Sequence, residues 1–279
     1  MMRRNVTTLV ALSLVFVILL ILAGSCEGVL ADVVYYAAFV IPMAIGLIAD
    51  RRQRRAEAEH DREYKEPESI LSLGRESTRL MLPLAVPTVA LTALAAYVTS
   101  LAVTAATGAE NAVDVGDSLA VALIAHALLP AVLEEALFRY LPMRMLARYG
   151  AHVTVIVSSA CFSLVHADVF QIPYALLAGV LFMSIDLICE SVWPSVIMHF
   201  MNNSLSVLYI MYSDADGFDT VYFTALAALI LVSFAFIIIM RKRYLERVRA
   251  LVSVREPLEG MGALIALAAP MILIAITSL

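Results

Sequence analysis

The sequence predicts an all-α protein, a polytopic transmembrane helix bundle of eight or nine spans. Of its 279 residues 62% are apolar and only 15% are charged, and the mean hydropathy is +0.90. A soluble domain is usually nearer half apolar and a quarter charged. The apolar residues also fall in runs of the length that a bilayer-spanning helix needs, about 20 residues. Residues 1–279 are therefore expected to form a single integral membrane domain.

Nine apolar stretches are candidate spans, and eight is the close alternative count. The fifth and sixth are short, as expected of helices packed inside a bundle rather than facing lipid. No internal repeat or separate soluble domain is apparent. The expected spans are Val6–Ala23, Val33–Ala49, Leu80–Ala106, Leu119–Phe138, Val153–His166, Pro173–Leu187, Trp193–Met211, Val221–Met240 and Gly260–Leu279.

The first span is preceded by Arg3 and Arg4, so a cleaved signal peptide is one interpretation. The residues 23–26 resemble a lipoprotein cleavage site only poorly, because the larger aliphatic residue expected three positions before Cys26 is missing. A retained signal anchor is therefore preferred.

The placement of Lys and Arg predicts the orientation in the membrane. Basic residues occupy the N-terminus, the charged loop 50–79 and the stretches 139–148 and 241–255, whereas the alternate loops contain acidic residues and no Lys or Arg. Basic loops stay on the cytoplasmic side. We expect a multi-pass protein of the plasma membrane with a cytoplasmic N-terminus and a charged cytoplasmic loop at 50–79. Within this loop, residues 50–68 are expected to be solvated and helical. No basic patch with interleaved aromatic residues points to nucleic acid, and the three cysteines lack the spacing of a disulfide framework.

Two adjacent carboxylates, Glu134 and Glu135, end the fourth apolar run. A charge at mid-bilayer costs roughly 3 kcal/mol. Neighbouring helical side chains point about 100° apart, and Glu135 is four residues before Arg139, the favourable order for an ion pair. Glu134 is then left to act as a general base. The alternative is that both glutamates are ordinary helix-end charges in the headgroup region.

Three further polar residues lie in later spans. His166 follows Phe162 by one turn, and His199 and Asn203 share a helix face, with Asn202 as a competitor for the same role. Two histidines and a glutamate in apolar helices resemble a metal site or an acid–base site.

Other charged and polar positions are expected to be structural. His126 lies eight residues before Glu134, about 80° away from its face, and is expected to make an interhelical hydrogen bond. Asp186 and Glu190 are interpreted as boundary charges. Glu134 is expected near the cytoplasmic end of its span, with a cavity opening there. His166 is expected about 20 Å into its own span. Tilted helices, or a fifth helix that starts outside the bilayer, must therefore bring Glu134 and His166 to the same depth.

The ordered motifs EExxxR (Glu134, Glu135, Arg139), FxxxH (Phe162, His166) and HxxxN (His199, Asn203) resemble those of the CAAX protease and bacteriocin-processing (Abi-type) family of intramembrane proteases. The resemblance covers about residues 119–210, a protease-like core. It implies an intramembrane endopeptidase that cuts a membrane-associated, in some cases lipidated, protein or peptide. By resemblance Glu134 and His166 would activate water, His199 and Asn203 would stabilise the oxyanion, and Glu135, Arg139 and Phe162 would hold the geometry.

The sequence leaves alternatives open for the cofactor and for the function. Zinc, if present, would be bound by Glu134, His166 and His199, but the sequence has no HExxH motif, and the metal-independent glutamate route is preferred. A non-proteolytic scaffold or bacteriocin-immunity protein is the alternative function. A transporter is less favoured, since repeats and broken helices are not visible.

Overall fold

The computed structural model describes residues 2–60, 70–71, 75–109 and 113–252. Within these residues every regular element is a helix, which confirms the all-α prediction. The wide π-helical turns η1 (Leu123–Leu128) and η2 (Ala136–Tyr140) join three of the helices end to end, and η3 (Ala147–Tyr149) is a 3₁₀ turn. The α-helices are α1 (Met2–Gly24), α2 (Val29–His60), α3 (Arg75–Thr107), α4 (Leu119–Ala122), α5 (Leu129–Glu135), α6 (Leu141–Leu146), α7 (Ala151–Leu164), α8 (Ile172–Cys189), α9 (Trp193–Tyr212) and α10 (Phe218–Val252).

The helices are those of a multi-pass membrane protein. By length and composition six of the described segments could cross a bilayer, namely Met2–Gly24, Val29–Ala56, Thr78–Thr107, Leu119–Leu146, Ile172–Cys189 and Phe218–Ala235. Helix α7 is apolar but shorter, and α9 contains His199 and two asparagines that lower its hydropathy. Each of the first eight predicted spans thus coincides with helical structure, although the fifth runs two residues past the end of α7 at Leu164, and the ninth, 260–279, lies outside the described residues.

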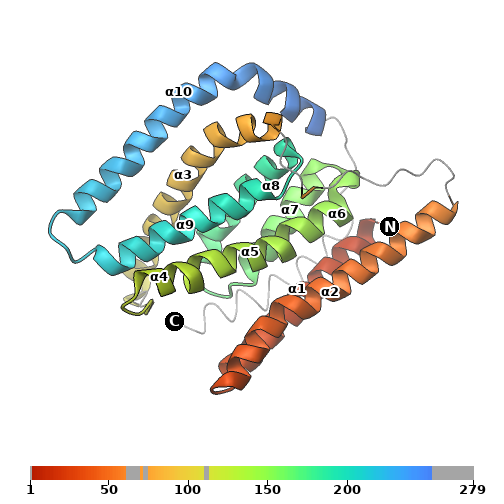
Figure 1. The fold of residues 1–279 in the computed structure, drawn as a ribbon, viewed down its shortest axis with the longest axis horizontal. Helices are drawn as coiled ribbons and strands as arrows, with labels where there is room; N and C mark the ends of the chain where they lie inside the picture. Colours follow the sequence, from red (N-terminus) through yellow and green to blue (C-terminus); the bar gives the residue numbers. More distant parts are fainter. Residues whose placement is uncertain (1, 61–69, 72–74, 110–112, 253–279) are drawn as a thin grey trace.

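The α9 helix occupies the middle of the bundle. It packs on α3, α5 and α8, while α7 and α8 pair with each other. The α1–α2 hairpin runs along one side of the molecule and α10 along the opposite side, over α3 (Figure 1). The polar motifs are on α5 and η2, at the end of α7 and just after it, and on α9, so the other helices enclose them.

Helices α7 and α8 approach each other closely at Gly179. A Cβ atom at this position would lie 3.0 Å from the Cα and 3.0 Å from the Cβ of Ser159. Only glycine leaves that space free, since native interiors are close-packed. The absent side chain therefore lets α8 lie against the helix that carries Phe162 and ends just before His166.

The fourth predicted span is wrong at its C-terminal end. We expected it to stop at Phe138, but η2 and α6 continue the same helical rod to Leu146. At about 1.5 Å per residue, Glu134 is about 18 Å from that end. Glu134 is therefore in the middle of the rod rather than near its cytoplasmic end, and the expected mismatch in depth with His166 disappears.

The charged segment 50–79 begins as a helix, because α2 continues to His60. Asp50 is only 1% exposed and binds both Arg54 (3.0 Å) and Arg144 of α6 (2.7 Å). The prediction of a helix is confirmed here. The prediction of a solvated segment is wrong for Asp50, which its ion pairs fasten to α6, whereas Arg51 and Arg52 are exposed. Residues 61–69 and 72–74 lie outside the described part.

The basic segments meet at one end of the bundle. Near the N-terminus, Asn5 donates a hydrogen bond to the carbonyl of Met145 (2.7 Å), and in α10 Arg247 pairs with Glu190 at the end of α8 (2.8 Å). Met143 and Leu187 share one apolar cluster that links these two groups. This end is called the basic end below. The other end is called the acidic end. It contains the start of α4, which Asp117 precedes, and the start of α10, which contains Asp219 (Figure 1).

Candidate active site

The site begins with a wide turn that a proline explains. In η2 the amide of Leu141 bonds to the carbonyl of Ala136, five residues back. Pro142 has no N–H, so the Phe138 carbonyl lacks its usual helical partner. That carbonyl instead accepts hydrogen bonds from Arg139 Nη1 (3.0 Å) and from the Ser158 hydroxyl. The proline thereby creates a binding point for an arginine inside the bundle.

Glu135 and Arg139 form the predicted ion pair. Arg139 Nε lies 3.1 Å from Glu135 Oε2, and both side chains are completely buried. The guanidinium also stacks over the ring of Phe162, 4.3 Å from its centroid. A buried charge is destabilising unless it is paired and hydrogen-bonded. Here the carboxylate of Glu135, the carbonyl of Phe138 and the ring of Phe162 together stabilise the buried guanidinium.

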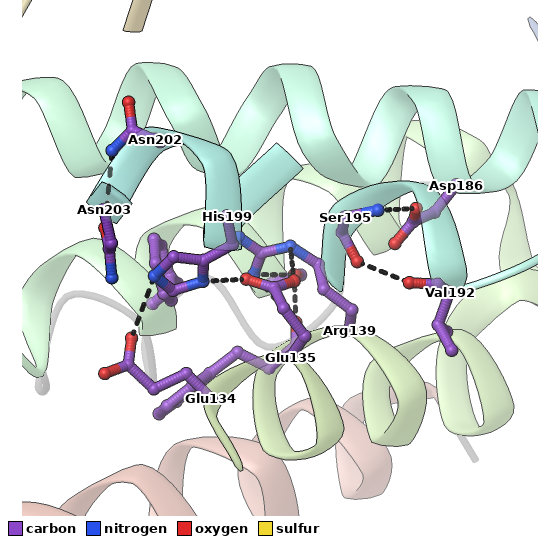
Figure 2. A network of polar contacts seen from close by, with 12 residues as sticks. Glu134, Glu135, Arg139, Asp186, Val192, Ser195, His199, Asn202 and Asn203 are labelled. Atoms are coloured by element: carbon purple, nitrogen blue, oxygen red, sulfur yellow. Dashed lines mark hydrogen bonds and ion pairs between the residues drawn. The ribbon is translucent and has the colours of Figure 1, made fainter. Parts of the chain in front are cut away.

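His199 is bound between the two glutamates (Figure 2). Its Nδ1 lies 2.7 Å from Glu135 Oε1, and its Nε2 lies 3.9 Å from Glu134 Oε2. A carboxylate only accepts, so Nδ1–H donates and Nε2 is directed toward Glu134. The contact between Glu135 and His199 was not predicted, because the motif spacing paired Glu135 with Arg139 alone.

His166 is oriented by the end of its own helix. Its Nδ1 lies 2.8 Å from the carbonyl oxygen of Phe162, one of the carbonyls that a helix C-terminus leaves without a backbone partner. Since a carbonyl only accepts, Nδ1 donates and Nε2 is the nitrogen left for other contacts. The Phe162 ring stands edge-on to His166 (5.0 Å) and to His199 (5.8 Å).

A cavity of about 220 Å³ collects the predicted site residues. Glu134, His166, His199 and Asn203 all line it, whereas Glu135 and Arg139 lie behind His199 without lining it. Glu134 is 18% exposed and so remains accessible. The other lining residues are Tyr35, Ala125, His126, Pro130, Phe162, Gln171, Tyr174, Ala175, Ala178, Phe182 and Asn202. Four polar residues from three helices thus face one space.

The cavity extends away from the basic end of the bundle. From Glu134 its lining continues to Pro130 and His126, and at the start of α8 it includes Gln171 and Tyr174. Toward the basic end the core is closed by fully buried side chains, among them Ser195. The rod continues beyond Glu134 to Leu146, so Glu134 lies well inside the basic end.

The two candidate asparagines have different surroundings. Asn202 is only 4% exposed, and its Oδ1 accepts a hydrogen bond from Thr92 of α3 (2.9 Å). Its Nδ2 lies 3.5 Å from Asn203 Oδ1. Both line the cavity, but Asn202 is tied to α3 and Asn203 is more accessible. Thr92 belongs to none of the three motifs, and no sequence signal distinguished it from other threonines.

His126 also faces this cavity, so its predicted position on another face is wrong. It lies in the π-helical turn η1, where the amide of Leu129 bonds to the carbonyl of Ile124. A turn with more than 3.6 residues rotates each residue by less than 100°, which brings His126 round toward the face of Glu134. The following Pro130 was the available signal, since a proline often accompanies an interrupted helical ladder.

The interpretation of Asp186 as a boundary charge is also wrong. It is completely buried, and its Oδ1 accepts a hydrogen bond from the backbone N–H of Ser195 (2.9 Å). Glu190 does lie at the boundary, 69% exposed and paired with Arg247. A possible signal was Val192, which precedes α9 and has no side chain able to cap a helix.

Glu134, His166 and His199, the residues considered above as zinc ligands, all line this cavity. Among the described residues no group of three or more His, Cys, Asp and Glu side chains is arranged to hold a metal ion. The Nδ1 atoms of His166 and His199 bond to oxygen acceptors of the protein, which leaves both Nε2 atoms for other contacts. The metal-independent route stays a prediction, and the chemistry considered below uses groups of the chain alone.

Within the helix bundle, a carboxylate, two histidines and an asparagine thus line one cavity. Residues 116–205, about a third of the chain, match the family model of the type II CAAX prenyl endopeptidase Rce1-like proteins. The match spans all three motifs and confirms the predicted family resemblance. The family that this segment matches is one of membrane endopeptidases. Comparisons with curated proteins and with solved structures find no match.

Proposed function

We propose that this protein is an intramembrane endopeptidase in which Glu134 activates water without a metal. The observation that carries the proposal is the 3.9 Å separation between Glu134 Oε2 and His199 Nε2. This distance is too long for a direct hydrogen bond and is suited to two groups that act on a water molecule and on a carbonyl oxygen between them.

The other residues support a complete hydrolytic cycle. Glu134 would take a proton from water while the water oxygen attacks the scissile carbonyl, with His166 Nε2 holding the water. The protonated His199, balanced by Glu135, and the Asn203 amide would donate hydrogen bonds to the developing oxyanion. The proton on Glu134 would then pass to the leaving amine. The peptide bond breaks, and Glu134 becomes a carboxylate again.

We infer that the substrate is a membrane-associated protein or peptide, lipidated substrates included. The walls that Tyr174, Ala178 and Phe182 contribute are apolar or aromatic, which suits a segment arriving from lipid. We also place the basic end at the cytoplasmic face, by the positive-inside rule. The cavity then extends toward the opposite face.

The test compares cells that produce the wild-type protein with cells that produce Glu134→Gln. New N-termini in the membrane fraction, detected by mass spectrometry, should be present with the wild type and absent with Glu134→Gln. The matched control is Glu190→Gln, the same chemical change at an exposed carboxylate outside the cavity. If Glu134→Gln produced the same new N-termini, or preserved every biological effect of the protein, the scaffold function would replace the protease.

A further inference from the structure

The first turn of α9 is anchored from a neighbouring helix. The first amides of a helix lack backbone partners and are usually capped by the preceding side chain. At α9 the preceding residue is Val192, which makes no side-chain cap. The N–H of Ser195 instead donates to Asp186 Oδ1 in the last turn of α8, at 2.9 Å (Figure 2).

Burial of the Asp186 carboxyl group is energetically unfavourable. It is 0% exposed, and its Oδ2 has no hydrogen-bond partner among the described residues. A buried polar atom without a partner is destabilising. The carboxyl nevertheless connects α8 to α9. A capping side chain at Val192, just before α9, would not make this connection. The contact therefore fixes one helix relative to the other.

This contact lies one turn away from His199. Ser195 and His199 are four residues apart on the same face of α9, and the Ser195 hydroxyl donates a hydrogen bond to the carbonyl of Val192 (2.9 Å). His199 is in turn 2.7 Å from Glu135 and 3.9 Å from Glu134. A shift of the first turn of α9 would change both distances, because the helix transmits it as a rigid element.

We propose that Asp186 is a positioning residue that sets the imidazole of His199 between the two glutamates by holding the Ser195 amide. Asp186 does not line the cavity, so it acts through α9 and not on the substrate. The catalytic consequence rests on the proposed protease function, but the effect on the His199 ring does not.

The experiment is ¹⁵N-histidine NMR of the full chain in lipid nanodiscs, with the His199 signals assigned by their loss in His199→Gln. In the wild type the Nδ1 signal should show a strong hydrogen bond to Glu135. Asp186→Ala should move this signal, and Asp186→Asn, which keeps an acceptor oxygen, should restore it. Glu190→Gln is the matched control on the same helix end and should leave it unchanged.

An Asp186→Ala protein with the same His199 signals as Glu190→Gln would overturn the proposal. If Asp186→Ala does not fold, Asp186→Ser, whose hydroxyl is too short to reach α9, takes its place with the same two outcomes. In the cleavage assay Asp186→Ala should reduce the new N-termini at least tenfold, and Asp186→Asn should recover them. An absence of cleavage even in the wild type would refute the protease function and leave the NMR result to decide on Asp186.

Discussion

The carboxylate of Glu135 lies 2.7 Å from Nδ1 of His199, although 64 residues separate the two in the chain. The same carboxylate is bound to Arg139 on its own helical rod. The second glutamate of the pair therefore orients the histidine, and the first, Glu134, is left facing the cavity. The two adjacent acids have distinct environments because one is sealed in the core and the other remains partly exposed.

Glu135→Gln should strongly destabilise the protein. The change leaves Arg139 buried without a countercharge, which typically costs about 3–5 kcal/mol. We expect a clear drop in the thermal unfolding temperature in nanodiscs. Glu134→Gln is the control, since Glu134 is 18% exposed and lies 3.9 Å from His199, and it should unfold near the wild-type temperature. Equal unfolding temperatures for the two variants would contradict the assignment of Glu135 to the core network.

Pro142→Ala should impair the site without loosening the rod. The new amide can bond to the Phe138 carbonyl, which now serves Arg139 and Ser158. Closing the wide turn would displace the guanidinium and, through Glu135, His199. A misplacement of about 1 Å can cost on the order of 10²-fold in rate. Quantifying the new N-termini tests this, with Pro87→Ala in α3 as the control. Wild-type cleavage by Pro142→Ala would show that the wide turn is dispensable.

Gly179→Ala should weaken the packing of α7 against α8. The added methyl would meet the backbone of Ser159 at 3.0 Å, and overpacking of this kind costs about 1–3 kcal/mol. Gly24→Ala is the matched control, because a Cβ there has no neighbour within 4 Å. Thermal unfolding of both variants measures the difference. Two variants of equal stability would mean that the helices can separate without cost.

Chelation should leave cleavage unaffected. The proposed mechanism uses Glu134, His166, His199 and Asn203 alone. The purified protein should therefore keep full activity after incubation with a strong chelator. Elemental analysis should find no stoichiometric metal in it. Loss of activity on chelation, with recovery on adding zinc, would show instead that Glu134 and the histidines rearrange to bind a metal.

Much of the candidate site followed from motif order. Four-residue spacings paired Glu135 with Arg139 and placed His199 and Asn203 on one face, because helical periodicity is a local property. His126 and Asp186 were misjudged for the same reason. A wide turn changes the periodicity around His126, and Asp186 has its partner on a different helix, so a straight, isolated helix was the wrong reference for both.

The sequence alone determined that this is an all-α membrane protein with an ordered set of acidic, imidazole and amide side chains, since hydropathy and helical spacing are written in the local chain. Only the tertiary structure decided which glutamate faces the cavity, that Glu135 holds His199, and that Asp186 anchors α9. Those relationships depend on how separate helices pack, and the packing is set by distant residues such as Gly179 and by the proline-linked wide turns of one rod.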